Sequence, residues 1–266
     1  MIGSENLKKF FCNLKKYYKY SVYAAKAELK SEITNSYLNW LWWFLDPISY
    51  MLIYTFIVEV VFKTTEQYFP VFVFIGLTTW DLFSKTVSGS VKLVKNNIGT
   101  INKVYLPKYI LLVSKSFEFL FKFLISFTLI IVLMLLFKVP FSWQILNFPI
   151  ILFIIYIISF GCGTILLHFG VFVEDLSNII NILLKLVFYF SGIFYAIATR
   201  IPAPFNKLMV TLNPVAFCID QFRRIFLYGA MPNYLLLFLW FIAGIILIVI
   251  GVSLINKYEN SYAKVV

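Results

Sequence analysis

Long apolar stretches recur along the chain, and they limit its possible folds more than any other feature. Six of them approach or exceed the roughly 20 mostly apolar residues that a helix needs to cross a hydrocarbon core of about 30 Å. They cover residues 37–62, 69–87, 109–137, 148–173, 179–198 and 234–255. Hydrophobic residues make up 61% of the 266 residues, more than a soluble domain of this length can bury. The sequence therefore predicts an all-α, polytopic membrane protein with six transmembrane helices.

The first 36 residues form a separate part of the predicted organisation. They are rich in Lys, and Leu, Phe and Tyr recur among the lysines near helical spacing. They lack the apolar core of a secretory signal peptide. We expect residues 1–36 to form an amphipathic helix on the cytoplasmic surface of the membrane, followed by a transmembrane domain at 37–266. A solvated basic tail is the alternative, and the many aromatic residues fit it less well.

The distribution of basic residues predicts the orientation of the spans. Segments 8–30, 85–115 and 257–264, on one side, hold 15 Lys residues, whereas the other side holds 6 basic residues. Because Lys and Arg gather on the cytoplasmic side, both termini are expected in the cytoplasm. The net charge of +11 then indicates contact with anionic membrane lipids, and no nucleic-acid partner is expected.

Charged residues inside the apolar stretches are costly in lipid and are therefore informative. They are Asp46, Glu59, Asp81, Glu118, Lys122 and Lys185. Lys115, Glu118 and Lys122 fall on one helical face, and the last two can form an i, i+4 ion pair. For Glu59 and Asp81, a solvated helix end is the alternative explanation.

Aromatic residues form a stripe along the first apolar stretch. Trp40, Trp43, Pro47, Tyr50 and Tyr54 follow one another at spacings of three and four, which places them on one face of a helix. Tyr hydroxyls facing hydrocarbon would lack hydrogen-bond partners, so this face is expected to meet protein or a pore. Plain helix packing is one interpretation, and an aromatic wall on which sugar rings slide is the other.

The chain carries none of the common catalytic motifs that we sought. It contains no GxxxxGK[ST] phosphate loop, no HExxH and no GxSxG. Cys12, Cys162 and Cys218 are far apart, which favours neither a disulfide framework nor a metal site. His168 lies in an apolar run and is interpreted as a helix histidine with a satisfied ring.

Several segments resemble the membrane subunits of ABC transporters that export lipid-linked O-antigen, capsule or teichoic acid. VKNNIGTINKVYLPKYILLVSK is similar to the family's connection between its second and third spans. FYFSGIFYAIATRIP is similar to a Ser-Pro-Ile-Phe-Tyr segment, with Gly192 in place of the usual Pro. LNPVAFCIDQFRRIFLYGAMP carries an Asn-Pro, Arg and Gly-x-x-Pro pattern, and VFVEDLSNII departs from the family at Glu174. The resemblance covers nearly the whole chain.

The resemblance implies a half-transporter without catalytic residues, metal or cofactor of its own. Two copies would form a homodimer and would pair with two copies of a separate ABC ATPase, which binds ATP and Mg. The complex would move an undecaprenyl-linked polysaccharide to the outer side of the cell (inner) membrane. Coupling to the ATPase is expected in the cytoplasmic loop at about 88–108, through Asn96, Asn97, Ile98, Ile101, Asn102, Lys103, Leu106 and Pro107.

The resemblance also implies short re-entrant helices on the outer face, at about 200–233 between spans five and six. This would explain why residues 211–229 are too polar to span lipid and too apolar for an ordinary loop. The expected outer cap comprises Asn213, Pro214, Asp220, Arg223 and Arg224, in which Asp220 can neutralise either arginine. The polymer would pass between spans one and five, whose conduit-lining aromatics are Trp40, Trp43, Tyr50, Tyr54, Phe188 and Tyr195.

Two other functions remain open at this point. The first is an ABC exporter permease for a drug or lipid, which the aromatic stripe and the basic amphipathic segment argue against. The second is a channel or scaffold, which would need no ATPase. Neither repeated glycines nor rings of charge typical of a selectivity filter occur in the sequence.

The predicted topology can be tested with a membrane-impermeant thiol reagent on intact cells. In a cysteine-free background, Lys207→Cys should be labelled because residues 200–233 are expected outside. Cys12, reintroduced alone, should stay unlabelled because basic segments resist translocation. Labelling at Cys12 but not at position 207 would reverse the topology.

Overall fold

The computed structural model describes residues 2–34, 39–61, 63 and 66–265, and this part of the chain contains helices and turns but no strand. The helices are α1 (Ile2–Thr34), α2 (Asn39–Thr55), the π-helix η1 (Phe56–Val61), α3 (Phe69–Val91), α4 (Leu93–Asn96), α5 (Ile98–Ile101), α6 (Lys108–Leu136), the 3₁₀-helix η2 (Trp143–Asn147), α7 (Phe148–Phe172), α8 (Leu176–Phe190), α9 (Ile197–Arg200), α10 (Phe205–Leu212), α11 (Pro214–Phe226) and α12 (Tyr234–Val265). The all-α prediction is confirmed for these residues.

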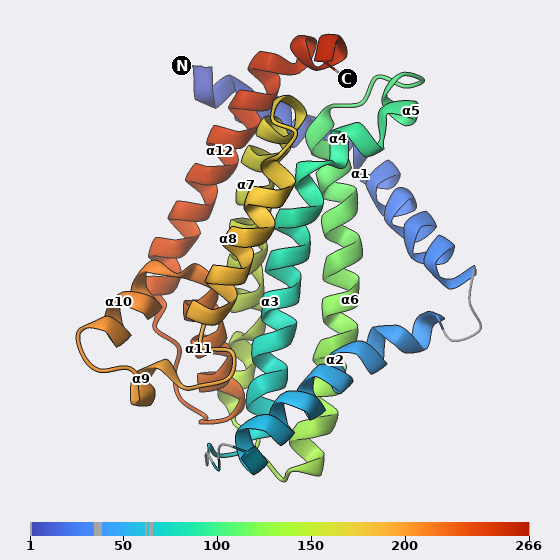
Figure 1. Ribbon diagram of the computed structural model, residues 1–266. Helices are drawn as coiled ribbons and strands as arrows, with labels where there is room; N and C mark the ends of the chain where they lie inside the picture. The colour runs from blue at the N-terminus through green and yellow to red at the C-terminus, as the bar shows by residue number, and fades with distance from the viewer. Residues whose placement is uncertain (1, 35–38, 62, 64–65, 266) are drawn as a thin grey trace.

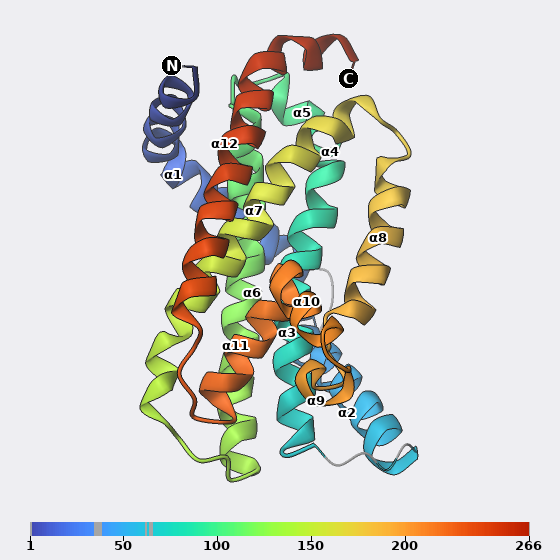
Figure 2. The ribbon, with the colours of Figure 1, turned by 90° about the vertical axis from the view of Figure 1, so that its left-hand side faces the viewer.

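The long helices α3, α6, α7 and α12 run side by side and define the long axis of the molecule (Figure 1). Both termini lie at one end, together with α4 and α5. The connection between α6 and α7 lies at the opposite end, towards which α9, α10 and α11 are also placed (Figures 1 and 2). The count of basic residues predicted that the termini and the segment containing α4 and α5 lie on one side of the membrane, and residues 200–233 on the other. The two ends of the molecule agree with this division.

Helix α3 occupies the centre of the bundle. It contacts α2, α6, α7, α8 and α11, and almost all of its residues are buried. Its hydroxyl groups donate to carbonyls of the preceding turn, as Thr78 Oγ1 does to Phe74 O at 3.0 Å and Thr79 Oγ1 to Ile75 O at 2.8 Å. Because protein covers most of α3 and these hydroxyls are satisfied, this helix tolerates a less apolar sequence than a lipid-facing span.

Glycines allow α7 and α12 to pack closely. A Cβ atom at Gly161 would stand 2.7 Å from Leu247 Cβ, and one at Gly244 would stand 2.5 Å from Ile157 Cγ2. A Cβ atom at Gly251 would collide with Thr164. Small residues at such positions bring helix backbones together, which is how van der Waals packing holds helices inside membranes.

Within the part of the chain that the structure describes, four stretches are long and apolar enough to cross a membrane: Leu41–Val61, Lys108–Leu136, Trp143–Phe172 and Tyr234–Glu259. The count of six spans therefore stays a prediction. Of the two others, α3 carries charged and hydroxyl residues, and α8 has only 15 residues, about 22 Å. The predicted helix at 179–198 is wrong in its boundary, because α8 ends at Phe190 and the chain turns at Gly192, whose φ is +63°. Proline, with its φ near −65°, could not adopt this turn.

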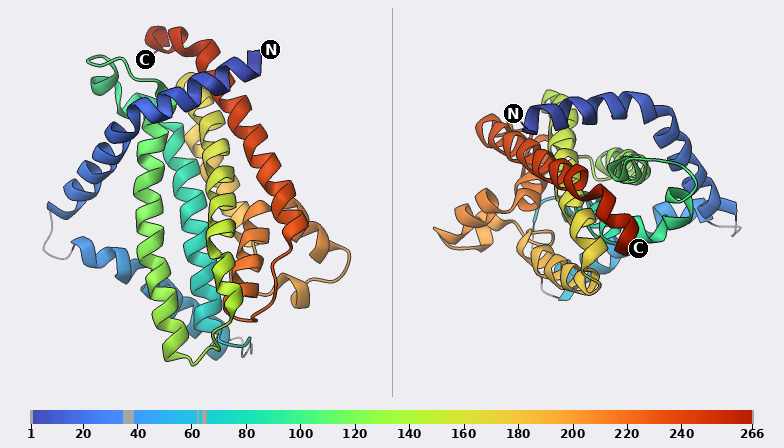
Figure 3. Two further views of the ribbon diagram at one scale, coloured as in Figure 1. Left: turned by 180° about the vertical axis from the view of Figure 1, so that it is seen from behind. Right: turned by 90° about the horizontal axis from the view of Figure 1, so that it is seen from above.

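Helix α1 is amphipathic, as its sequence predicts. It wraps around the bundle against α6 and α12 (Figure 3). Phe10 and Ala25 are buried, and Asn13 Nδ2 donates to Tyr109 Oη at 2.6 Å. Its lysines are exposed: Lys8, Lys9, Lys15, Lys16, Lys19, Lys26 and Lys30. Residues 35–38, which include the predicted boundary at 36, lie outside the described part of the chain.

The predicted interpretation of His168 is also confirmed. Its Nδ1 lies 2.7 Å from the hydroxyl oxygen of Tyr262, and the ring packs among Phe169, Phe172 and Tyr258. The histidine thus links α7 to the end of α12 as a structural residue.

A buried ion cluster links α6 to α1. The Glu118 carboxylate is 1% exposed and lies 2.7 Å from Lys115 Nζ and 2.9 Å from Lys122 Nζ. Lys122 Nζ also lies 2.8 Å from Glu32 Oε1. The predicted pair between Glu118 and Lys122 is therefore confirmed, and Glu32 extends it to another helix.

Removing the charge of Glu118 should destabilise the protein. Glu118→Gln leaves Lys115 and Lys122 without the anion that lies between them, and breaking a buried ion pair in this way costs about 3–5 kcal/mol. The melting temperature of the detergent-purified protein should fall clearly. Glu32→Gln is the control, and it should cost less because the Glu32 side chain is 36% exposed. Equal melting temperatures for the two variants would contradict this assignment.

Candidate functional site

The predicted coupling segment is a protruding turn made of α4 and α5, at the end of the molecule that holds both termini (Figure 1). Its exposed residues are Asn96, Asn102 and Lys103, its half-buried residues are Asn97, Ile98 and Ile101, and Leu106 and Pro107 are buried at its base. The short helix expected around Ile98 and Ile101 is present as α5. Contact with an ATPase through this turn stays a prediction.

Sequence reasoning missed the exposed apolar end of this turn. Val104 is 57% exposed and Tyr105 is 68% exposed. The Tyr105 hydroxyl donates to Glu259 Oε2 at 3.4 Å, and Lys108 Nζ lies 3.8 Å from Glu259 Oε1. The negative charge of Glu259 raises the pKa of Tyr105. Glu259 thus ties the base of the turn to the end of α12.

The aromatic stripe of α2 meets protein along part of its length. Trp43 Nε1 donates to Glu32 Oε2 at 3.2 Å, and the Tyr54 ring lies 3.9 Å from the Phe194 ring, centroid to centroid. Tyr50 is 56% exposed. The side chain of Trp40 lies outside the described part of the chain.

The stripe continues into an aromatic cluster that joins α2, α3 and α8. The Phe188 ring lies 5.3 Å from the Trp80 ring and 5.4 Å from the Phe194 ring. Tyr195 lies beyond the end of α8, and its hydroxyl donates to Tyr189 O at 2.8 Å. Of these residues, Trp80 and Phe194 were not predicted. The spacing of aromatic residues along α2 could not identify Trp80 and Phe194, because they lie on α3 and on the turn after α8.

The Asn-Pro pair starts the second of two short helices, α10 and α11. The Asn213 side-chain oxygen accepts from Val215 N at 3.0 Å and from Ala216 N at 3.2 Å, which caps α11. Pro214 occupies the first turn, where its missing N–H is not needed. Asn213 Nδ2 also donates to Ser191 Oγ at 3.0 Å and so fixes α11 to the turn after α8.

Arg223 is the centre of this region. It is 5% exposed, and its guanidinium donates to Gly192 O at 2.7 Å, to Ile193 O at 2.7 Å and to Phe72 O at 3.1 Å and 3.2 Å. It also stacks on the Phe72 ring, 3.3 Å from the ring centroid. One side chain of α11 therefore binds both the start of α3 and the turn after α8.

Asp220 pairs with Arg224 rather than with Arg223. Its carboxylate lies 3.2 Å from Arg224 Nε at i, i+4, and it accepts from Gln221 Nε2 at 3.0 Å. Gln221 is buried and accepts from Asn233 N at 2.6 Å, which fixes the chain before α12. From the sequence, either Arg223 or Arg224 could be the partner of Asp220. The structure selects Arg224, because the guanidinium of Arg223 donates to three buried carbonyls instead.

The described part of the chain offers no group of three His, Cys, Asp or Glu side chains suited to a metal ion. The family model described as ABC-2 type transporter matches residues 22–227. The chain belongs to the ABC-2 type transporter family. The matched residues of this transporter include the predicted coupling turn of α4 and α5, the aromatic cluster and the Arg223 contacts.

Curated relatives agree with the family. The chain is 30% identical over 206 residues to the O-antigen export system permease protein RfbA of Myxococcus xanthus, covering 77% of this chain and 79% of the relative. It is 28% identical over 240 residues to RfbA of Klebsiella pneumoniae, covering 90% and 91%. It is 25% identical over 214 residues to the polysialic acid transport protein KpsM of Escherichia coli, covering 78% and 80%.

Replacing Arg223 by Lys should destabilise this transporter although the charge is retained. A lysine ammonium lacks the planar fork of donors, and each buried carbonyl left without a partner costs about 1–3 kcal/mol. The melting temperature should fall and export should be lost. Arg224→Lys is the matched control, since its half-exposed ion pair contributes only about 0–1 kcal/mol. If the two variants have the same melting temperature, the carbonyl contacts of Arg223 do not hold α11 in place.

Proposed function

We propose that this chain is the permease subunit of an exporter that moves an undecaprenyl-linked polysaccharide from the cytoplasmic to the outer side of the cell membrane. A separate ABC ATPase subunit hydrolyses ATP. The observation that carries the proposal is the similarity to an O-antigen export permease over 90% of this chain. The relative named for polysialic acid transport also handles a polysaccharide.

Exposed charges on neighbouring helices support a conduit formed by two copies of the chain. Asp46 on α2 and Lys185 on α8 are exposed, and both helices pack on α3. On α3 itself, the side chains of Asp81 and Lys85 are 46% and 55% exposed. Charges on apolar helices are costly against hydrocarbon and are found facing protein or water-filled cavities. A second copy would close this face around a polar passage.

The proposed orientation places both termini and the α4–α5 turn in the cytoplasm. The exposed lysines of α1 would then face anionic lipid of the inner leaflet while its apolar side packs on α6 and α12. At the other end, α11 has 13 residues, about 20 Å, and is too short to span a bilayer. Its buried contacts suit a re-entrant cap at the outer mouth.

The connections of the coupling turn suggest how movement would be transmitted. α3 ends at Val91 directly before α4, and α6 begins at Lys108 directly after the turn. A push by the ATPase on α4 and α5 therefore acts on the two helices that border α2. Since α3 contacts α2, α8 and α11, its displacement reaches both the aromatic cluster and the proposed outer cap.

The proposal can be tested by deleting the gene for this protein in the cells that produce it. Cells without it should accumulate a lipid-linked glycan inside and lose that glycan from the surface. Normal surface glycan in these cells would reject polysaccharide export and would favour the drug or lipid exporter.

Disrupting the coupling turn should separate export from membrane insertion. Ile98→Asp together with Ile101→Asp places charges on the half-buried face of α5 and should abolish both export and co-purification with the ATPase. Abundance in the membrane should remain, because the turn lies outside the bundle. Ile98→Val with Ile101→Val keeps the surface apolar and serves as the control. Full export by the Asp variant would show that α5 is not the contact.

A further inference from the structure

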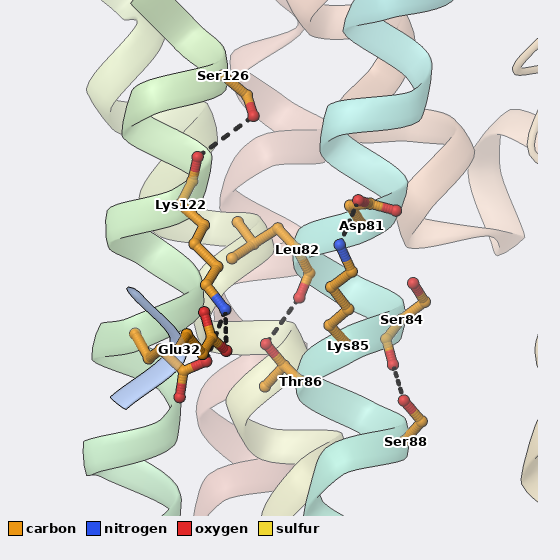
Figure 4. Close-up of polar contacts among 10 residues, drawn as sticks. Glu32, Asp81, Leu82, Ser84, Lys85, Thr86, Ser88, Lys122 and Ser126 are labelled. Carbon is orange, nitrogen blue, oxygen red and sulfur yellow. Dashed lines mark hydrogen bonds and ion pairs between the residues drawn. The ribbon is translucent and has the colours of Figure 1, made fainter. Parts of the chain in front are cut away.

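A polar cavity lies where the end of α1 approaches α2, α3 and α6. Its volume is about 210 Å³. Figure 4 shows some of the residues that line it: Asp81 and Lys85 on α3, Lys122 and Ser126 on α6, and Glu32 on α1. Trp42, Trp43 and Asp46 of α2 also line it, together with apolar residues of α3 and α6. The volume is smaller than the 300–1,000 Å³ of typical drug-sized sites, so the cavity suits one small unit rather than a long ligand.

The cavity lies about midway along α3 and is open at the surface of the protein. Asp81 is about 15 Å along the axis of α3 from its end at Val91. Its carboxylate and the ammonium of Lys85, 2.6 Å away, are both about half exposed. An ion pair exposed to hydrocarbon at this depth would be strongly unfavourable. The opening therefore belongs to the polar passage rather than to the lipid surface.

The charges of the cavity disfavour an anionic ligand. Three carboxylates line it, those of Glu32, Asp46 and Asp81, against two ammonium groups. Both ammonium groups are already engaged: Lys85 with Asp81, and Lys122 with Glu32 and Glu118 at 2.8 Å and 2.9 Å. A phosphate or an acidic sugar would meet the excess of negative charge.

The same groups suit a neutral sugar. Ionised carboxylates only accept hydrogen bonds, and the vicinal hydroxyls of a sugar are donors that match them. Asp46 is exposed, and among the described residues it makes no ion pair, so its oxygens are accessible. Trp42 is 50% exposed and offers an electron-rich ring to the C–H face of a sugar.

We propose that this cavity is a carbohydrate subsite for a single neutral sugar unit, with Trp42 as the stacking surface and Asp46 and Asp81 as hydroxyl acceptors. The inference rests on the proposed function and adds a location and a charge preference to it. The site lies beside the aromatic stripe but depends on Trp42, which is not a member of that stripe. Such a subsite would hold the polysaccharide in place between translocation steps.

The first experiment measures the appearance of polymer at the cell surface, with the partner ATPase present. Asp46→Asn replaces one acceptor oxygen by an NH2 group and removes the negative charge, and Trp42→Leu removes the stacking ring. Neither change breaks an ion pair. The rate should fall about tenfold or more, the loss expected for a hydrogen bond to a charged group together with a stacking contact. Glu59→Gln together with Trp143→Leu is the matched control, because Glu59 and Trp143 are also exposed and lie outside the cavity.

Equal rates for the two double variants at equal membrane abundance would overturn the subsite. The result is separable from the proposed function, which fails only if cells lacking the whole chain still display the polymer. A subsite can therefore be rejected while polysaccharide export stands.

The second experiment tests the charge preference on the purified complex with its ATPase. In a cysteine-free background, Ser126→Cys places a thiol on the cavity wall, and its rate of modification by a small thiol reagent is followed. Maltoheptaose should slow the modification, whereas an oligogalacturonate of the same length should not. Asn102→Cys on the exposed coupling turn should be unaffected by either sugar. Absence of protection by maltoheptaose, or equal protection by both sugars, would overturn the proposal.

Discussion

The end of the molecule opposite the termini depends on the buried guanidinium of Arg223. Helix α8 ends early, at Phe190, and the carbonyls of the turn after it lie outside any helix. Arg223 supplies donors to Gly192 O and Ile193 O in the turn that follows, and to Phe72 O in α3. Burying a charge is costly unless it is hydrogen-bonded, and here the guanidinium is satisfied by backbone carbonyls of two segments. This one side chain makes a short α8 and a non-spanning α11 compatible with a stable fold.

Charged side chains in this apolar chain fall into two groups with different surroundings. Glu118 is buried and has a lysine partner on each side, and Glu32 shares one of them, so this cluster holds α1 against α6. Asp46, Asp81 and Lys85 instead remain accessible on α2 and α3. The first group is satisfied inside the protein. The second needs water or a polar ligand, which is the physical reason for assigning it to the proposed passage.

Helix α3 connects the regions that the proposed transport cycle uses. Its last residue directly precedes the coupling turn, its middle carries Asp81 and Trp80, and its first turn contributes the Phe72 carbonyl to Arg223. Because it is packed on nearly every side, a displacement at one end cannot be absorbed locally. A movement of the turn would therefore displace the proposed sugar subsite, the aromatic cluster and the proposed cap.

The sequence by itself determined the features that depend on neighbours along the chain. Apolar length indicated helices that cross a membrane, the spacing of lysines and aromatics indicated an amphipathic α1, and the i, i+4 spacing indicated the pair between Glu118 and Lys122. The cap of α11 by Asn213, which the structure shows, is local in the same way, since capping acts within one turn. Tertiary structure decided the rest. Arg223 and Phe72 lie 151 residues apart, and Glu32 and Lys122 lie 90 apart, so no local pattern could pair them. The end of α8 at Phe190 and the position of Trp42 in a polar cavity likewise follow from how the helices pack, because packing selects which polar groups find partners and which remain open to a ligand.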